Sequence, residues 1–135
     1  MSNKWRAQLK QFEQAVLRLQ EVLQLPKNSV VRDSSIQRFE FCCELSWKVL
    51  KLFLAEQGVV TSFPKETIRE AFARGLLEND LFWIRTIDLR ILSSHTYNEL
   101  LADEIYNELT GALPMFQKLV KRLSEYRTED GPKTS

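Results

Sequence analysis

Histidine and cysteine are scarce in this chain of 135 residues, which contains one histidine and two cysteines. The cysteines, Cys42 and Cys43, are adjacent in the sequence, and neighbouring cysteines rarely bridge each other because the geometry is strained. One such pair is no disulfide framework. The single histidine, His95, nearly excludes a zinc site of the usual composition. A serine-protease or thiol-protease arrangement would also have to use His95.

Glycine is also scarce, and the chain has neither a large excess of one charge nor a long apolar run. Four scattered glycines form neither a G-x-G-x-x-G motif nor a P-loop. Nineteen Lys and Arg against eighteen Asp and Glu leave a net charge of +1. A site that binds RNA or DNA must therefore depend on positive charge concentrated locally, because the chain as a whole is nearly neutral. No apolar run approaches the roughly 18 residues that cross a bilayer, and residues 1–10 lack the apolar core of a signal peptide. We therefore expect a cytoplasmic protein with no membrane partner.

The residues that are abundant favour helices. Leu, Glu, Gln, Lys and Arg are common, while there are only four prolines and four glycines. Apolar residues that recur every three or four positions predict helices at about 3–25, 34–57, 62–73, 79–92 and from 96 onward. The pattern predicts an all-α fold, an antiparallel up-and-down bundle of four to five helices. We expect one domain over residues 1–126 and a flexible tail over 127–135.

The ends of the predicted helices carry recognisable signals. Pro26 should end the first helix, and Asp33 or Ser34 can cap the second. Gly58 and Gly75 stand where the second and third helices should end. The run Thr96-Tyr97-Asn98-Glu99 is a capping-box pattern that should start the fifth helix.

The second predicted helix is apolar around much of its circumference. One apolar seam is joined by a second set on other faces, made of Phe41, Cys42, Leu45, Val49, Leu52 and Phe53. A helix of this kind must be buried by more than one neighbour. In so small a domain one neighbour can be another subunit, so the sequence favours a homodimer.

The stretch between the fourth and fifth predicted helices holds the residues best suited to chemistry. Arg90 falls in the last turn of the fourth helix, and His95 at the break that follows. Arginine can hold phosphate oxygens, and histidine can move a proton near neutral pH, so the pair suits phosphodiester chemistry. Three structural interpretations stay open: His95 can be a hydrogen-bonded junction residue, Arg90 a helix-end cation, and Tyr97 a packing residue.

A family resemblance adds to this interpretation. Arg90, His95 and Tyr97 follow the pattern R-x4-H-x-Y, and residues 39–48 (FEFCCELSWK) and 63–72 (FPKETIREAF) agree with its flanking segments. Together they resemble the HEPN-domain toxins, also labelled nucleotidyltransferase substrate-binding proteins, which are encoded beside a minimal nucleotidyltransferase. The resemblance covers about residues 5–125.

The resemblance implies a fold, an activity and a partner. Members of this family are helical bundles whose dimers bring two R-x4-H motifs together as a metal-independent endoribonuclease, without a cofactor. The nucleotidyltransferase antitoxin transfers AMP to the motif tyrosine. By this resemblance, Arg90 and His95 are the catalytic pair and Tyr97 is the residue that receives AMP. The resemblance does not say whether the RNA substrate is tRNA or mRNA.

Apart from the resemblance, Asp88 and Ser94 are candidates for a supporting role. Asp88 can orient a site group or be a solvated helix-end carboxylate. Ser94, like Ser93, can donate to phosphate or serve as a helix-end residue.

One departure and two alternatives accompany the resemblance. Family members often carry a polar residue, commonly Asn, directly after the motif arginine, and this chain has Ile91 there. The first alternative is a non-catalytic subunit that presents substrate to a nucleotidyltransferase. The second is a helical dimerisation module with a vestigial motif.

Overall fold

The computed structural model describes residues 4–127. Within that range the chain is helical and contains no strand, which confirms the expected all-α fold. The helices are α1 (Lys4–Leu23), α2 (Ser29–Glu56), α3 (Pro64–Ala73), α4 (Asp80–Leu92) and α5 (Glu99–Arg127), with a short 3₁₀ turn, η1 (Ser93–His95), between the last two. The expected tail lies outside the described residues, except for Arg127 at the end of α5. No helix within residues 4–127 is long and apolar enough to span a membrane.

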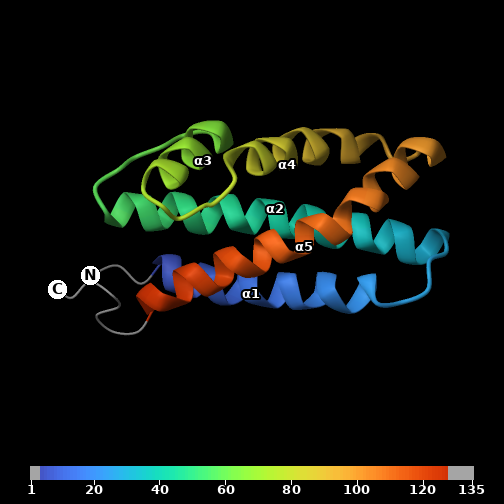
Figure 1. The fold of residues 1–135 in the computed structure, drawn as a ribbon, viewed down its shortest axis with the longest axis horizontal. Helices are drawn as coiled ribbons and strands as arrows, with labels where there is room; N and C mark the ends of the chain where they lie inside the picture. Colours follow the sequence, from blue (N-terminus) through green and yellow to red (C-terminus); the bar gives the residue numbers. More distant parts are fainter. Residues whose placement is uncertain (1–3, 128–135) are drawn as a thin grey trace.

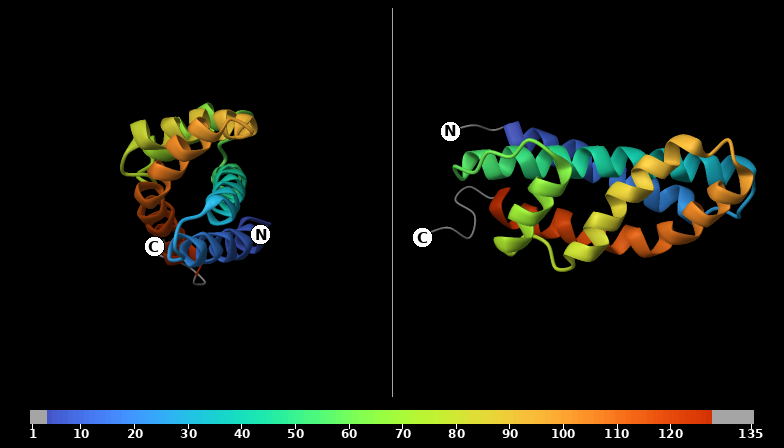
Figure 2. Two further views of the ribbon diagram at one scale, coloured as in Figure 1. Left: turned by 90° about the vertical axis from the view of Figure 1, so that its right-hand side faces the viewer. Right: turned by 90° about the horizontal axis from the view of Figure 1, so that it is seen from above.

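The four long helices alternate in direction. Figure 1 shows α1, α2, α4 and α5 running up and down the long axis, and the short α3 lies near the end where α1 begins. Figure 2 shows the same arrangement from the end and from above. The junction of α4 with α5 lies toward the opposite end, near the connection from α1 to α2 (Figure 1).

Aromatic side chains join the long helices in the core. Phe116 of α5 is fully buried and lies with its ring centroid 6.1 Å from that of Phe12 on α1. The centroids of Phe39 on α2 and Trp83 on α4 lie 6.0 and 5.5 Å from that of Phe116. Contacts of this kind orient the helices as well as burying apolar area. The position of α4, which carries Arg90, is therefore fixed by the core.

The second helix begins earlier than the sequence indicated. We expected a cap at Asp33 or Ser34, but α2 starts at Ser29 because Asn28 caps it. The Asn28 side chain accepts a hydrogen bond from the Val31 N–H at 2.8 Å. Residues 29–33, which the sequence placed before the helix, therefore belong to its first turns.

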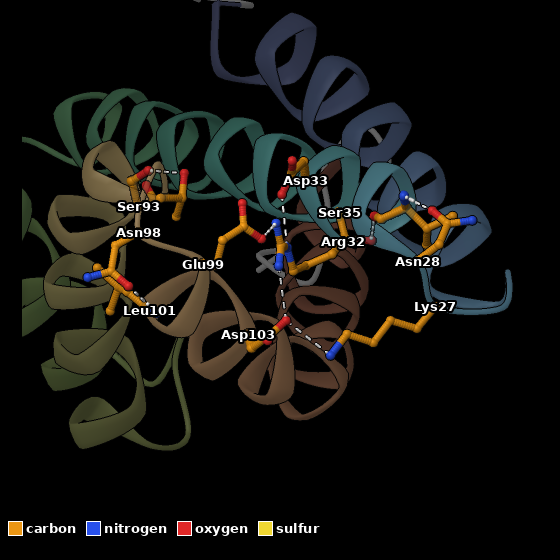
Figure 3. Close-up of polar contacts among 12 residues, drawn as sticks. Lys27, Asn28, Arg32, Asp33, Ser35, Ser93, Asn98, Glu99, Leu101 and Asp103 are labelled. Atoms are coloured by element: carbon orange, nitrogen blue, oxygen red, sulfur yellow. Dashed lines mark hydrogen bonds and ion pairs between the residues drawn. The ribbon is translucent and has the colours of Figure 1, made fainter.

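The fifth helix begins later than expected. The capping-box pattern predicted a start at Thr96, but α5 starts at Glu99. Asn98 Oδ1 accepts from the Leu101 N–H at 3.1 Å (Figure 3), while the Thr96 hydroxyl donates to the Ser93 carbonyl oxygen at 3.1 Å. Tyr97 therefore lies before the helix, outside its first turn.

The turns after α2 and α3 confirm the two glycine signals. Gly58 and Gly75 have φ of 87° and 77°, in the left-handed region where a side chain is strained.

A cluster of charges ties the start of α2 to the start of α5 (Figure 3). The side chain of Arg32 is only 5% exposed and forms ion pairs with three carboxylates. Its contacts are 2.9 Å to Asp33, 2.9 Å to Glu99 and 3.1 Å to Asp103. These carboxylates raise the pKa of the Arg32 guanidinium. The cluster holds the first turn of α5 in place, directly after Tyr97.

Asp103 gives this cluster a pH dependence. Hydrogen bonds from Arg32, and then from Lys27 at 3.1 Å, hold the pKa of the Asp103 carboxyl below its ordinary value of 3.8. A depressed carboxyl pKa means that the ionised group favours the folded state above pH 3.8, and this contribution is lost as the pH falls through the lowered value.

We expect Asp103→Asn to lower the urea midpoint of unfolding near neutral pH. The difference from the natural chain should shrink below pH 3.8, because the wild-type carboxyl is then also losing its charge. Urea titrations at several pH values measure this, with Glu104→Gln as the matched loss of an exposed carboxylate on the same helix. A difference that stays constant with pH would show that Asp103 acts through packing instead.

Candidate active site

The junction between α4 and α5 is shaped by short polar side chains that bond to the backbone. The Ser93 hydroxyl lies 2.7 Å from the Arg90 carbonyl oxygen, and the Ser94 hydroxyl lies 2.8 Å from that of Ile91. The last carbonyl groups of a helix need such partners, because they have no N–H within the helix. Residues 93–96 (SSHT) therefore end α4, and the first three of them form the turn η1.

Arg90 is held in the last turn of α4 by three side chains. Its Nε–H donates to Glu44 Oε2 at 3.0 Å, and its Nη1 lies 3.5 Å from Glu40 Oε2. The same Nη1 lies 3.5 Å from the hydroxyl of the buried Ser93, which also donates to the Glu40 carboxylate. The Arg90 side chain is 32% exposed. An arginine in this position is oriented by the protein and still reachable from solvent.

His95 and Tyr97 lie at the surface, one turn beyond Arg90. The Tyr97 hydroxyl is 3.4 Å from His95 Nδ1, and the two rings meet edge to face with centroids 5.9 Å apart. Tyr97 is 81% exposed, so it adds little to the core. An exposed imidazole beside a phenol can exchange protons with a bound molecule.

The structure brings these residues together as two pairs. Arg90 is linked to Ser93, and His95 to Tyr97, but no hydrogen bond within residues 4–127 joins Arg90 to His95. The two supporting candidates lie differently. Ser94 is exposed beside Arg90, whereas Asp88 is exposed and acts on Arg85, whose pKa it helps to raise after the larger effect of Glu108.

Sequence reasoning assigned no role to Glu40 and Glu44, and gave Ser93 none beyond contacting phosphate or ending the helix. Glu40 and Glu44 are one turn apart on α2, inside the segment that carried the family resemblance. They lie 50 and 46 residues before Arg90 in the chain, so no local pattern could pair them with it.

A shallow groove runs past Arg90. It is bordered by Arg90, Ile91, Ser94 and Ile87 from the α4 side and by Glu44, Trp47 and Pro64 from α2 and α3. A second groove shares Glu44, Trp47 and Pro64 and extends along α2 to Lys48 and Lys51. Both lysines are exposed, so positive charge borders the path that leads to Arg90.

The two cysteines do not contribute chemistry at this site. Both are buried, and burial raises the pKa of the Cys42 thiol to about 12 and that of Cys43 well above its ordinary value. Both therefore stay protonated near neutral pH, which makes them poor nucleophiles. Within residues 4–127 there is no group of three His, Cys, Asp or Glu side chains that could hold a metal ion.

Comparison with known proteins gives consistent findings. Residues 7–125 match the model of a family described as nucleotidyltransferase substrate binding protein like. A Haemophilus influenzae protein named probable ribonuclease HepT is 31% identical over 111 residues, 76% of either chain. A crystal structure from Thermus thermophilus is 36% identical with a TM-score of 0.79, covering 83% of this chain and 98% of the other. HI0074 of Haemophilus influenzae, described as having the fold of a substrate binding domain of a nucleotidyltransferase, is 27% identical with a TM-score of 0.69, covering 90% and 98%.

Two neighbouring serines provide a matched test of the contacts around Arg90. We expect Ser93→Ala to lower the free energy of unfolding by about 1 kcal/mol, because the Glu40 carboxylate loses a hydrogen-bond donor in a buried position. Ser94→Ala removes an exposed hydroxyl and should change the free energy by less than about 0.5 kcal/mol. Urea unfolding of both variants measures the difference, and equal effects would contradict the assigned role of Ser93.

Proposed function

Because the chain belongs to the nucleotidyltransferase substrate binding protein-like family, we propose that it is a ribonuclease toxin of a toxin–antitoxin pair. In this proposal it cleaves RNA without a metal ion, using Arg90 and His95. A nucleotidyltransferase antitoxin neutralises it by transferring AMP to Tyr97. The relative named probable ribonuclease HepT supports the nuclease activity, and the family description supports the partner.

One observation carries the proposal. The only histidine in the chain is exposed one turn beyond an arginine that the fold holds at the edge of a groove, and it touches an exposed tyrosine. A purely structural histidine would be expected to bond to the backbone or the core, but the hydrogen bond described for His95 joins it to Tyr97. The groove continues toward Lys48 and Lys51, which can attract the phosphates of an RNA strand.

The chemistry follows from what RNA itself supplies. The 2′-hydroxyl attacks the adjacent phosphorus, and a histidine acting as general base takes its proton. The bond from phosphorus to the 5′-oxygen breaks, and a second histidine gives that oxygen a proton. Arg90 binds the phosphate oxygens and stabilises the charge of the five-coordinate transition state. The products are a 2′,3′-cyclic phosphate and a 5′-hydroxyl.

A homodimer gives each catalytic proton transfer its own histidine. One chain contains a single histidine, while the reaction uses a base and an acid at the same time. Ile91 is 61% exposed next to Arg90, and Phe41 on α2 is 50% exposed. Apolar side chains left at the surface of so small a domain are suited to burial against a second copy.

AMP transfer to Tyr97 would block the same site. The phenol oxygen attacks the α-phosphorus of ATP, pyrophosphate leaves, and the phenol proton is lost to solvent. The phosphodiester that forms carries a negative charge beside His95, where an RNA phosphate must bind. Inhibition then follows from both bulk and like-charge repulsion.

A second function is favoured by the description of one relative. HI0074 is described as having the fold of a substrate binding domain of a nucleotidyltransferase. In that case this chain presents a substrate to a nucleotidyltransferase and cleaves nothing. The departure at Ile91 from the polar residue common in the toxin family agrees with this alternative.

We expect pure, unmodified protein to cleave total RNA or tRNA in the presence of EDTA. His95→Ala should lower the rate about a hundredfold to ten-thousandfold, because proton transfer is lost. Arg90→Ala should lower it about a hundredfold or more, because charge stabilisation is lost. Gel analysis of the fragments, with a chemical test for cyclic phosphate ends, measures both.

Arg85→Ala is the matched control for Arg90→Ala. Arg85 lies on the same helix but is exposed and paired with Glu108 at 2.9 Å, so its loss should leave cleavage unchanged. If Arg90→Ala and His95→Ala still cleave at the wild-type rate, the nuclease assignment is wrong. If the verified unmodified wild-type protein leaves RNA intact, the substrate-presenting function is favoured instead.

We expect co-expression with the neighbouring nucleotidyltransferase to add about 329 Da per transferred AMP. Tyr97→Phe should abolish this adduct while leaving RNA cleavage intact, because it removes only the hydroxyl. Tyr106→Phe is the matched control, since Tyr106 is partly buried on α5 and lies under the Lys27 ammonium group. Intact-mass spectrometry checks the outcome, and an adduct that persists in Tyr97→Phe would place the modification elsewhere.

A further inference from the structure

The nitrogens of the Arg90 guanidinium do not all have hydrogen-bond partners. Glu44 accepts one hydrogen bond, from Nε–H at 3.0 Å, and Glu40 lies on the Nη1 side at 3.5 Å. Among the described residues, the remaining nitrogen, Nη2, has no hydrogen-bond partner. The edge formed by Nε and Nη2 is one of the two that bind phosphate or carboxylate with two parallel hydrogen bonds. Glu44 therefore uses half of a two-point binding edge.

The two glutamates also differ in how firmly they are held. Glu40 is 22% exposed and accepts a hydrogen bond from the buried Ser93, which lies on the same helix end as Arg90. Glu44 is 55% exposed, and its described ion pair is the one with Arg90. Exposed ion pairs contribute little to stability and exchange readily with solvent and solutes, whereas a pair supported by a buried hydroxyl keeps its geometry.

We propose that Glu40 is a positioning residue for Arg90 and that Glu44 covers the phosphate-binding edge of Arg90 until an RNA phosphate displaces it. This rests on the proposed function in naming RNA as the ligand. Glu40 and Ser93 lie on the Nη1 side of the guanidinium, and Glu44, which borders the groove with Arg90, lies on the Nε side. A phosphate that replaces Glu44 gains two hydrogen bonds where the carboxylate had one.

The two glutamates therefore have opposite effects on RNA binding. The Glu44 carboxylate competes with phosphate for the Nε–H group, so removing its charge should strengthen binding. The Glu40 carboxylate orients the guanidinium, so removing its charge should weaken binding and also lower the rate of cleavage. A general repulsion between acidic residues and RNA would give both substitutions the same sign.

The test uses two measurements on the purified full chain. The first is binding of a fluorescent 2′-O-methyl RNA oligonucleotide, which lacks the 2′-hydroxyl nucleophile and cannot be cleaved, measured by anisotropy. The second is kcat and KM for cleavage of the unmodified RNA. Glu44→Gln should tighten oligonucleotide binding about threefold to fivefold and lower KM with little change in kcat. Glu40→Gln should weaken binding and lower kcat about tenfold.

Two controls isolate the role of Arg90. Glu104→Gln removes an equal charge from an exposed position on α5 and should leave binding unchanged. The gain in binding affinity from Glu44→Gln should vanish in a variant that also carries Arg90→Ala, because the two substitutions act through one contact. The unfolding midpoint of each variant, measured in urea, restricts the comparison to folded protein.

The possible outcomes separate this inference from the proposed function. If Glu44→Gln still tightens RNA binding in the Arg90→Ala background, or tightens it no more than Glu104→Gln does, the role of Glu44 is overturned. A Glu40→Gln variant that folds and keeps wild-type kcat and affinity overturns the role of Glu40. If no variant cleaves RNA but the opposite changes in oligonucleotide binding occur and need Arg90, the nuclease function fails while the two glutamate roles stand. If the wild-type chain does not bind the oligonucleotide, the glutamate roles fail as well.

Discussion

The burial of α2 is the constraint on which the rest of the structure depends. This helix packs against α1, α3, α4 and α5, and its buried residues extend from Arg32 to Leu54. A charged side chain that such a helix buries needs a partner on a neighbouring helix, because an unpaired buried charge is costly. Arg32 finds carboxylates on α5, and Glu40 and Glu44 find Arg90 on α4. The ion pairs that α2 makes with α4 and α5 therefore lie on both sides of the α4–α5 junction.

The local sequence was enough to predict most of the helices. Gly58 and Gly75 stand at helix ends as predicted, because such a signal depends on the nearby backbone only. The start of α2 was missed because Asn28, Asp33 and Ser34 are all good capping residues, and only the folded contacts select Asn28.

The composition of the candidate site was less predictable. Arg90, His95 and Tyr97 are close in the chain, and a motif could find them. Their surroundings come from α2, 46 or more residues away, and depend on how the helices pack. One sequence alone carries no signal for such a pairing. The near-neutral total charge was likewise uninformative about the site, because it averages Arg90 with the glutamates that surround it.

The two ends of the described chain meet at the end of the bundle far from η1 (Figure 1). The Arg6 guanidinium donates to the Tyr126 carbonyl oxygen at 3.5 Å, so the start of α1 lies against the end of α5. A fluorescent protein or affinity tag attached at either end would thus leave the His95 end of the bundle open to solvent.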